Sequence, residues 1–265
     1  MNILITNDDG VFAPGLWAAV EALEGIGRVV VVAPDREQSG VGGSVTLNNP
    51  VRAKQVVPTV EGTLTWAVEG TPADSVILAL ESLVKDVDLV VAGINMGANL
   101  GEDVLISGTV GAALQGYTRG IPSIALSLAS LRPTGFQAAA LVLQQLAIQA
   151  KEGLIPAGVL LNVNVPPVPV DQLQGLDVTR LARRTYADTV RPGDDGKNGY
   201  YWITRTRPAW DMQQGTDVWA VRSRRVSVTP LHTNLTAADA MAGLAGLSQR
   251  LNDGLKPAAK PATAS

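Results

Sequence analysis

The sequence contains no cysteine and only one histidine, His232, among its 265 residues. The lack of cysteine excludes disulfide bonds, thiolate metal sites and cysteine nucleophiles, and it is typical of proteins from a reducing compartment. A single histidine excludes metal sites built from several imidazoles. Acid, base and ligand roles therefore fall mainly on Asp, Glu, Ser, Asn, Lys and metal-bound water.

A broad basic surface is also absent, because the net charge is −3. We therefore expect no nucleic-acid polymer as a partner, and any nucleotide contact should be local. The N-terminus has no basic, cleavable apolar leader, and no run is long and apolar enough to cross a bilayer. These absences predict a soluble cytoplasmic protein without a membrane partner.

What the sequence does contain is a strand, an acidic turn and a helix at its very start. Residues 2–6 are typical of a short buried strand, Asn7-Asp8-Asp9-Gly10 follows, and Pro14 is suited to open a helix. A buried carboxylate is costly unless it is paired or bound to a metal, so two in succession favour a cation site. Turn or capping chemistry is the alternative interpretation.

Strands and helices alternate through the first 166 residues. Apolar runs at 29–33, 88–93, 121–128 and 159–165 are typical of buried strands, and helical patterns separate them. Such βαβ units predict an α/β fold with a mostly parallel sheet flanked by helices. Residues 41–69 differ, and we interpret them as an antiparallel excursion over the sheet edge. Thr71 is predicted to cap the following helix.

The pattern changes after Pro167. Strands are predicted at 177–186 and 200–207 around a hairpin tip at 191–199, followed by a strand at 222–231 and a helix at 237–251. We therefore divide the chain into a core (1–166), a C-terminal hairpin and helix appendage (167–254) and a disordered tail (255–265). Aromatic residues concentrated on the appendage indicate a subunit interface: Tyr200, Tyr201, Trp202, Trp210 and Trp219.

Four predicted loops place oxygen-bearing side chains at one rim, since the carboxyl ends of parallel strands share an edge. These side chains are Asp8, Asp9, Ser39, Asn95, Asn99, Ser107 and Thr109. Carboxylate, amide and hydroxyl oxygens suit one hard divalent cation, Mg²⁺ or Mn²⁺. Asn95 and Asn99 lie in a long Gly-rich loop, 94–109, and long loops of this kind are usually functional.

Ser107-Gly108-Thr109 immediately precedes a predicted helix. Its backbone N–H groups and two hydroxyls would cradle a phosphate, whereas the simpler interpretation is an N-cap. The position on the same rim as the carboxylates favours phosphate.

We interpret the remaining polar residues as structural. A lone histidine such as His232 is more often structural than catalytic. Paired arginines usually form a solvated face, although these four are able to reach a phosphate: Arg183, Arg184, Arg205 and Arg207.

Several motifs, in order, resemble those of the SurE survival-protein family, which comprises metal-dependent 5'-nucleotidases also described as acid phosphatases. The motifs are Asn7-Asp8-Asp9-Gly10, Ala33-Pro34-Asp35-Arg36 with Ser39-Gly40, Gly70-Thr71-Pro72, Gly93-Ile94-Asn95 with Gly97 and Asn99, Ser107-Gly108-Thr109 and Thr229-Pro230-Leu231-His232. Two positions depart from the family pattern: Asn234, where an Asp is expected, and Glu69, where an Asn is frequent.

The resemblance implies a Rossmann-like core and a C-terminal part that exchanges arms between subunits of a homodimer or homotetramer. It also implies one divalent cation held by Asp8, Asp9, Ser39 and Asn95. The implied substrates are nucleoside monophosphates, with 3'-nucleotides and short polyphosphate as further candidates.

The resulting hypothesis is metal-dependent phosphomonoester hydrolysis. Its catalytic residues are Asp8, Asp9, Asn99 and Ser107, and the phosphate contacts Asn99, Ser107, Gly108 and Thr109. The sequence leaves open whether Asp8 or Asp9 acts as a base or as a nucleophile. A nucleotide- and Mg²⁺-binding sensor without turnover and a nucleotide-dependent transferase are the alternatives.

Overall fold

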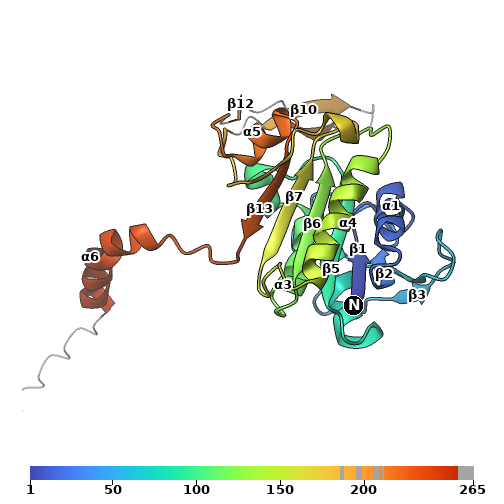
Figure 1. Cartoon of the computed structure of the whole chain (residues 1–265). Helices are drawn as coiled ribbons and strands as arrows, with labels where there is room; N and C mark the ends of the chain where they lie inside the picture. Colours follow the sequence, from blue (N-terminus) through green and yellow to red (C-terminus); the bar gives the residue numbers. More distant parts are fainter. Residues whose placement is uncertain (186–187, 195–198, 206–208, 211, 256–265) are drawn as a thin grey trace, which may run out of the picture. The chain divides into compact units, whose positions relative to one another are not determined.

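A computed structural model describes residues 1–185, 188–194, 199–205, 209–210 and 212–255 (Figure 1). The chain forms two compact units, Met1–Leu231 and His232–Ser265. The first unit contains the sheet and all of the predicted metal and phosphate ligands. The division at residue 166 into a catalytic core and an appendage stays a prediction.

A nine-stranded sheet forms the centre of the first unit, in the order β3-β4-β2-β1-β5-β6-β7-β13-β8. Neighbouring strands from β4 to β7 are parallel, β3 and β13 run antiparallel to β4 and β7, and β8 runs parallel to β13. The predicted mostly parallel α/β sheet is therefore confirmed. The strands are β1 Asn2–Thr6, β2 Arg28–Pro34, β3 Ala53–Gln55, β4 Leu64–Val68, β5 Leu89–Met96, β6 Ser123–Leu128, β7 Leu160–Val165, β8 Leu176–Val178 and β13 Val226–Leu231.

Helices cover both faces of this sheet. Alternate residues of β1 face opposite ways, so Ile3 and Ile5 pack in one apolar core with α1 and α4, and Leu4 packs in the other with α2 and α3. The resulting three layers are visible in Figure 1, where α4 lies in front of β6. The helices are α1 Pro14–Leu23, α2 Pro72–Leu78, α3 Gly108–Tyr117, α4 Gln137–Lys151 and α5 Asp217–Arg222, with a π turn at Ala79–Leu83 and 3₁₀ turns at Gly101–Leu105 and Val170–Gln172.

Thr71 caps α2 as predicted. Its Oγ1 accepts a hydrogen bond from the backbone N–H of Asp74, and the Asp74 carboxylate accepts one from the N–H of Thr71, which completes a capping box with Pro72 at the first helical position. The same carboxylate also accepts hydrogen bonds from the backbone and the hydroxyl of Thr46. These bonds to the charged carboxylate lower the pKa of Asp74 against the effect of its burial.

The interpretation of residues 41–69 as an antiparallel excursion is wrong in part. Only β3 is antiparallel, and β4 pairs in parallel with β2 from Val30↔Leu64 to Pro34↔Val68. The connection of 29 residues between β2 and β4 (35–63) allows this pairing, because parallel strands need a crossover of at least a dozen residues. The predicted loop 94–109 is also shorter, since β5 continues to Met96 past an irregular pairing between Ala92 and Asn95.

The hairpin exists, and β11 Gly199–Arg205 confirms its second predicted arm, but the first predicted arm, 177–186, was wrong. β10 Asp188–Asp194 pairs with β11, so much of the predicted tip belongs to a strand. Pro192 and Gly193 fit there because both strands of a two-stranded ribbon have a free edge. Residues 177–178 instead lie in β8 of the main sheet, and β9 Arg184–Thr185 pairs with β12 Ala209–Trp210.

Two further boundaries differ from those predicted. Arg222 ends α5 rather than starting a strand, because Thr216 caps this short helix through the N–H of Trp219. In the second unit, α6 Ala238–Leu255 confirms the predicted helix and extends it by four residues. The predicted tail lies outside the described residues from 256 onward. Among the helices in the described part of the chain, none is long and apolar enough to span a membrane.

Candidate metal and phosphate site

A cavity of about 170 Å³ lies where β1, β2 and β5 end. Five of the predicted site residues line it: Asp8, Ser39, Asn95, Asn99 and Ser107. The structure therefore brings together side chains from all four predicted loops. The cavity also includes Asp103 of the 3₁₀ turn, which the sequence reasoning missed because nothing in its local pattern distinguishes it from neighbouring Glu102.

Asp8 is buried against the first turn of α3. Thr109 Oγ1 donates a hydrogen bond of 2.6 Å to Asp8 Oδ1, and the Thr109 backbone N–H also stabilises this carboxylate. Burial raises the pKa of Asp8 and the bonds from Thr109 oppose that rise. The backbone carbonyl of Asp8 accepts a bond of 2.7 Å from the N–H of Gln38, which ties the loop after β1 to the loop that carries Ser39.

Asp9 lies beside Asp8 and accepts a hydrogen bond of 3.2 Å from the N–H of Met96 at the end of β5. Burial is the largest cause that raises the pKa of Asp9 to about 6, and the negative charges of Asp8 and Glu37 add to it. Two adjacent carboxylates whose charges repel each other create a site that a cation would stabilise.

Asn7 shapes the turn that presents both carboxylates. Its side-chain Nδ2 donates to the carbonyl of Gly10 and its Oδ1 accepts from the N–H of Gly10, so one amide closes the turn in both directions. Gly10 has a φ of 103°, a backbone conformation that favours glycine. Asn7 is fully buried, and sequence reasoning gave it no role although an Asn before a Gly turn is a known signal.

Ser107 and Gly108 fix the start of α3 against the site. Ser107 Oγ accepts a hydrogen bond of 3.2 Å from the N–H of Val110, so Ser107 is the N-cap and also lines the cavity. A Cβ atom on Gly108 would lie 2.8 Å from Asp8 Cβ, so only glycine allows this approach. Gly108 and Thr109 face Asp8, and among the four predicted phosphate contacts Asn99 and Ser107 are the two that line the cavity.

Asn95 near the end of β5 and Asn99 just after this strand are held by short hydrogen bonds. Asn95 Nδ2 donates to the carbonyl of Gly97 over 2.8 Å, and Asn99 Nδ2 donates to Ser127 Oγ over 2.8 Å. Ser39 is different, because it is exposed at the cavity edge and its hydroxyl donates to Glu37 Oε1. Asn95 and Asn99 are therefore preorganised by the fold, whereas Ser39 is freer to change its partner.

The donor set fits a hard divalent cation. Two carboxylates, one amide and one hydroxyl resemble the sparse protein ligation of Mg²⁺, which keeps several waters. No group of three or more His, Cys, Asp or Glu residues suited to a metal occurs in the described ranges, which argues against a site made of those residues alone. The mixed oxygen set is thus the remaining candidate for the cation.

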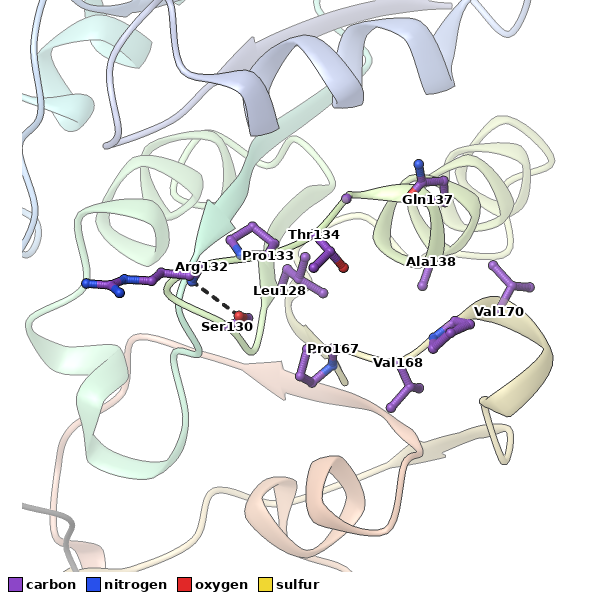
Figure 2. A pocket seen from close by; sticks show the side chains of 12 residues that line it. Leu128, Ser130, Arg132, Pro133, Thr134, Gln137, Ala138, Pro167, Val168 and Val170 are labelled. Atoms are coloured by element: carbon purple, nitrogen blue, oxygen red, sulfur yellow. Dashed lines mark hydrogen bonds between the residues drawn. The ribbon is translucent and has the colours of Figure 1, made fainter.

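A second, larger cavity of about 520 Å³ lies at the ends of β6 and β7, beside the start of α4 (Figure 2). Leu128, Pro133, Pro167, Val168 and Val170 give it an apolar lining, and Thr134 lies at its centre in the view. The loop after β6 separates the two cavities: its Leu131 lines the smaller one, and the flanking Ser130 and Arg132 line the larger.

His232 and Arg183, two of the residues that were interpreted as structural, do not line the small cavity. His232 is exposed, and its Nδ1 accepts a hydrogen bond from the N–H of Asn234. Arg207 and the side chains of Arg184, Arg205 and Trp210 lie outside what the structure describes. Tyr200 and Trp202 of β11 are exposed and pack edge to face, with ring centroids 6.1 Å apart.

Comparison with known proteins decides the family. The model of the family described as "Survival protein SurE" matches residues 3–188, which is most of the chain. The chain belongs to the SurE family. The match includes every residue of the predicted metal and phosphate set, and it also includes the buried turn residue Asn7.

Individual SurE relatives agree with this assignment. A protein of Dehalococcoides mccartyi strain CBDB1 named 5'-nucleotidase SurE is 47% identical over 238 residues, covering 89% of this chain and 90% of the relative. One of Moorella thermoacetica with the same name is also 47% identical, covering 89% and 92%. The crystal structure of the SurE protein from Aquifex aeolicus has a TM-score of 0.80 and 41% identity, and the match covers 94% of this chain and all of that one.

Proposed function

We propose that this member of the SurE family is a 5'-nucleotidase, which hydrolyses nucleoside monophosphates to nucleoside and phosphate with the help of one divalent cation. The single observation that carries this proposal is a pair of adjacent carboxylates, the buried Asp8 and the half-buried Asp9, at a small cavity that Asp8 lines together with amide and hydroxyl groups. Relatives that are 43–47% identical over about nine-tenths of the chain carry the name 5'-nucleotidase SurE, which supports it.

Asp8, Asp9, Ser39 and Asn95 would hold the cation, either Mg²⁺ or Mn²⁺. When bound, such a cation supplies Lewis-acid stabilisation of negative charge on a phosphoryl oxygen. Ser39 is the ligand that must reorient, because its hydroxyl is directed at Glu37. The Asn95 amide donates through Nδ2 to Gly97, which leaves its Oδ1 as the atom suited to a cation.

The remaining predicted site residues would bind the phosphate, and one of the two carboxylates would act as the general base. Asn99 and Ser107 would contact the phosphoryl oxygens. Gly108 and Thr109 would belong to the same phosphate-binding turn, and both contact Asp8. We assign the proton-handling role to Asp9. Burial raises the pKa of both carboxyls, but Asp8 is held by donors from Thr109, whereas Asp9, with a pKa of about 6 in the metal-free protein, accepts a backbone hydrogen bond from Met96 and is the freer of the two to take up a proton.

The nucleoside must extend beyond the small cavity, because about 170 Å³ is too little for a whole nucleotide. We propose that it passes the loop after β6 and enters the larger cavity. The apolar residues there suit a base or ribose face, and Ser130, Thr134 and Gln137 offer hydrogen-bonding groups. Activity on 3'-nucleotides and short polyphosphate would follow if only the phosphate were strictly required.

We also propose that the protein is a cytoplasmic homodimer or homotetramer assembled through residues 167–254. Exposed apolar side chains on two C-terminal elements support the assembly: Tyr201, Trp202 and Ile203 of β11, and Met241, Leu244, Leu247, Leu251 and Leu255 of α6. Exposed large apolar side chains that gather on one element are typical of interaction sites. Light scattering of the purified protein measures the subunit number directly.

The experiment that tests the function is a phosphate-release assay with a panel of nucleoside monophosphates in the presence of Mg²⁺, Mn²⁺ or EDTA. The proposal predicts release with a divalent cation and none with EDTA. Binding of nucleotide without release of phosphate would instead identify a sensor. Phosphate transfer to a second substrate without release to water would identify a transferase.

A further inference from the structure

Two fully buried asparagines, Asn162 and Asn164 of β7, hold the backbone of Asn99. Asn164 Oδ1 accepts a hydrogen bond of 2.8 Å from the Asn99 N–H, and Asn164 Nδ2 donates one of 3.0 Å to the Asn99 carbonyl. Asn162 Nδ2 donates a further bond of 2.8 Å to the same carbonyl. Both polar groups of the Asn99 peptide are thus satisfied by side chains from another element, 63 and 65 residues away in the sequence.

These asparagines belong to a row of polar residues that crosses the sheet beneath the loop. Ser127 of β6 pairs with Asn164, and Asn164 pairs with Ser227 of β13, in strands that lie side by side in Figure 1. Ser127 Oγ accepts the side-chain N–H of Asn99, so β6 holds the side chain and β7 holds the backbone of one residue. A primary amide buried in a strand costs free energy unless it is hydrogen-bonded, whereas an apolar residue would fill the same position without that cost. Such amides therefore need partners.

The residue pattern of β7 indicates that the side chains of Asn162 and Asn164 stabilise the loop after β5 more than they stabilise the sheet. Residues on the opposite face of β7, Leu161, Val163 and Val165, pack in an apolar core, and Leu160 is apolar on the same face as the asparagines. Asn162 also has a buried Oδ1 with no hydrogen-bond partner among the described residues. This arrangement contributes little to the sheet itself, and its hydrogen bonds go to a residue that lines the small cavity.

A second anchor holds the same loop two residues further on. Asp217 of α5 is fully buried, and its Oδ2 accepts a hydrogen bond of 2.7 Å from the N–H of Gly101. Its Oδ1 accepts from the N–H groups of Ala182 and Val218. Residues 99–101 are therefore held at both ends, which restricts their backbone conformation. Restriction of this kind preorganises a binding site.

We propose that Asn162 and Asn164 are positioning residues for phosphoester hydrolysis, which fix the peptide of Asn99 so that its side chain stays at the phosphate. This inference rests on the proposed nucleotidase function and extends it to residues remote from the cation ligands. A displacement of about 1 Å in such a residue can lower the rate about a hundred-fold.

The test compares Asn164→Ala and Asn162→Ala with Thr179→Val. Thr179 Oγ1 bonds to Ser227 and Thr229 in the same buried part of the sheet, and these partners belong to β13 rather than to the loop, so its substitution measures the cost of losing buried polar bonds alone. Each variant is assayed for kcat and KM with a nucleoside monophosphate, for Mn²⁺ affinity by calorimetry, and for thermal midpoint.

We expect kcat to fall about ten-fold or more in Asn164→Ala, less in Asn162→Ala, with Mn²⁺ affinity within about three-fold of wild type. Thr179→Val should lower the thermal midpoint and leave kcat unchanged. Folded asparagine variants with kcat within two-fold of wild type would overturn the inference. If Asn164→Ala does not fold, Asn162→Ala decides alone, because it leaves both Asn164 bonds in place.

The two proposals fail differently. A wild-type protein that releases no phosphate from any nucleoside monophosphate would remove the proposed function, and the positioning role with it. Wild-type activity that is lost in Asp9→Asn but kept in both asparagine variants would leave the function standing and remove only the positioning role.

Discussion

Thr109 Oγ1 donates a hydrogen bond of 2.6 Å to Asp8 Oδ1 and so joins the first turn of α3 to the end of β1. The Asp8 carboxylate accepts this hydroxyl and the backbone N–H of Thr109 at a helix N-terminus, where negative charge is favoured. These bonds orient the Asp8 carboxylate and oppose, without cancelling, the rise in its pKa that burial causes. The helix start that sequence reasoning assigned to phosphate thus also supports a carboxylate.

Replacing Thr109 by Val removes the hydroxyl and keeps the shape of the side chain. We expect a loss of about 1.5–3 kcal/mol in the free energy of unfolding, because the bond is made to a charged group. The pKa of Asp8 should rise further, so Mn²⁺ affinity at neutral pH should fall about ten-fold. Thr65→Val is the control, since Thr65 is buried in β4 and its hydroxyl donates a hydrogen bond to the Thr63 carbonyl. Equal Mn²⁺ affinity in both variants would refute the role of Thr109.

Gly108→Ala tests the close approach of α3 to Asp8. The added methyl group would lie 2.8 Å from Asp8 Cβ and 2.9 Å from Oδ2, so either the helix or the carboxylate must move. We expect about 1–3 kcal/mol of destabilisation and a large loss of phosphate release. Gly43→Ala in the loop after β2 is a suitable control, because its nearest contact would be an ordinary 4.0 Å. A fully active Gly108→Ala enzyme would show that this packing is not needed.

The raised pKa of Asp9 predicts a pH-dependent stability difference in metal-free protein. The folded state binds this proton more tightly than the unfolded state, so ionisation of Asp9 destabilises the fold above pH 6, and the penalty disappears as the pH falls from about 6 to 4. Asp9→Asn should therefore be more stable than wild type at pH 7.5 and equal to it near pH 4. Because part of the carboxyl is exposed, we expect a difference on the order of 1–2 kcal/mol.

Chemical denaturation of both proteins with EDTA measures this difference. Saturating Mn²⁺ should reverse the order at pH 7.5, because a ligand that binds the folded state stabilises it and the variant lacks one carboxylate. A stability difference that does not change with pH would contradict the assigned pKa of Asp9.

Val168→Trp should obstruct the larger cavity and test whether the nucleoside enters it. We expect KM for nucleoside monophosphates to rise about ten-fold, while p-nitrophenyl phosphate, which lacks the nucleoside, is hydrolysed at the wild-type rate. Val57→Trp, at a position that is 86% exposed, is the control for the added indole. Equal losses with both substrates would place the effect on the catalytic cavity instead.

The parallel core and the rim of four loops could be predicted from the sequence. Buried β-branched runs are local signals, and the carboxyl ends of parallel strands always lie at the same edge of the sheet. It could not give the direction of β4, since alternating polarity is the same in parallel and antiparallel strands. The shift of the hairpin to β10 and β11 also depends on pairing that no local pattern fixes.

Contacts between distant segments explain the missed residues. Asn162 and Asn164 were visible as polar interruptions of an apolar strand, but their partner Asn99 is identified only when the chain is folded. The same holds for Asp217, whose bond to Gly101 joins residues 116 positions apart. Local sequence signals point to the candidate ligands of the site and leave out the residues that support them.

Phosphate release from a nucleoside monophosphate by wild type, Asp8→Asn and Asp9→Asn, each with Mn²⁺ and with EDTA, tests the central claim most directly. Both substitutions keep side-chain size and remove one charge from the carboxylate pair. We predict release by the wild type with Mn²⁺, none with EDTA, and at least a hundred-fold loss of kcat/KM in each variant. Full Mn²⁺-dependent activity in both variants would contradict the account.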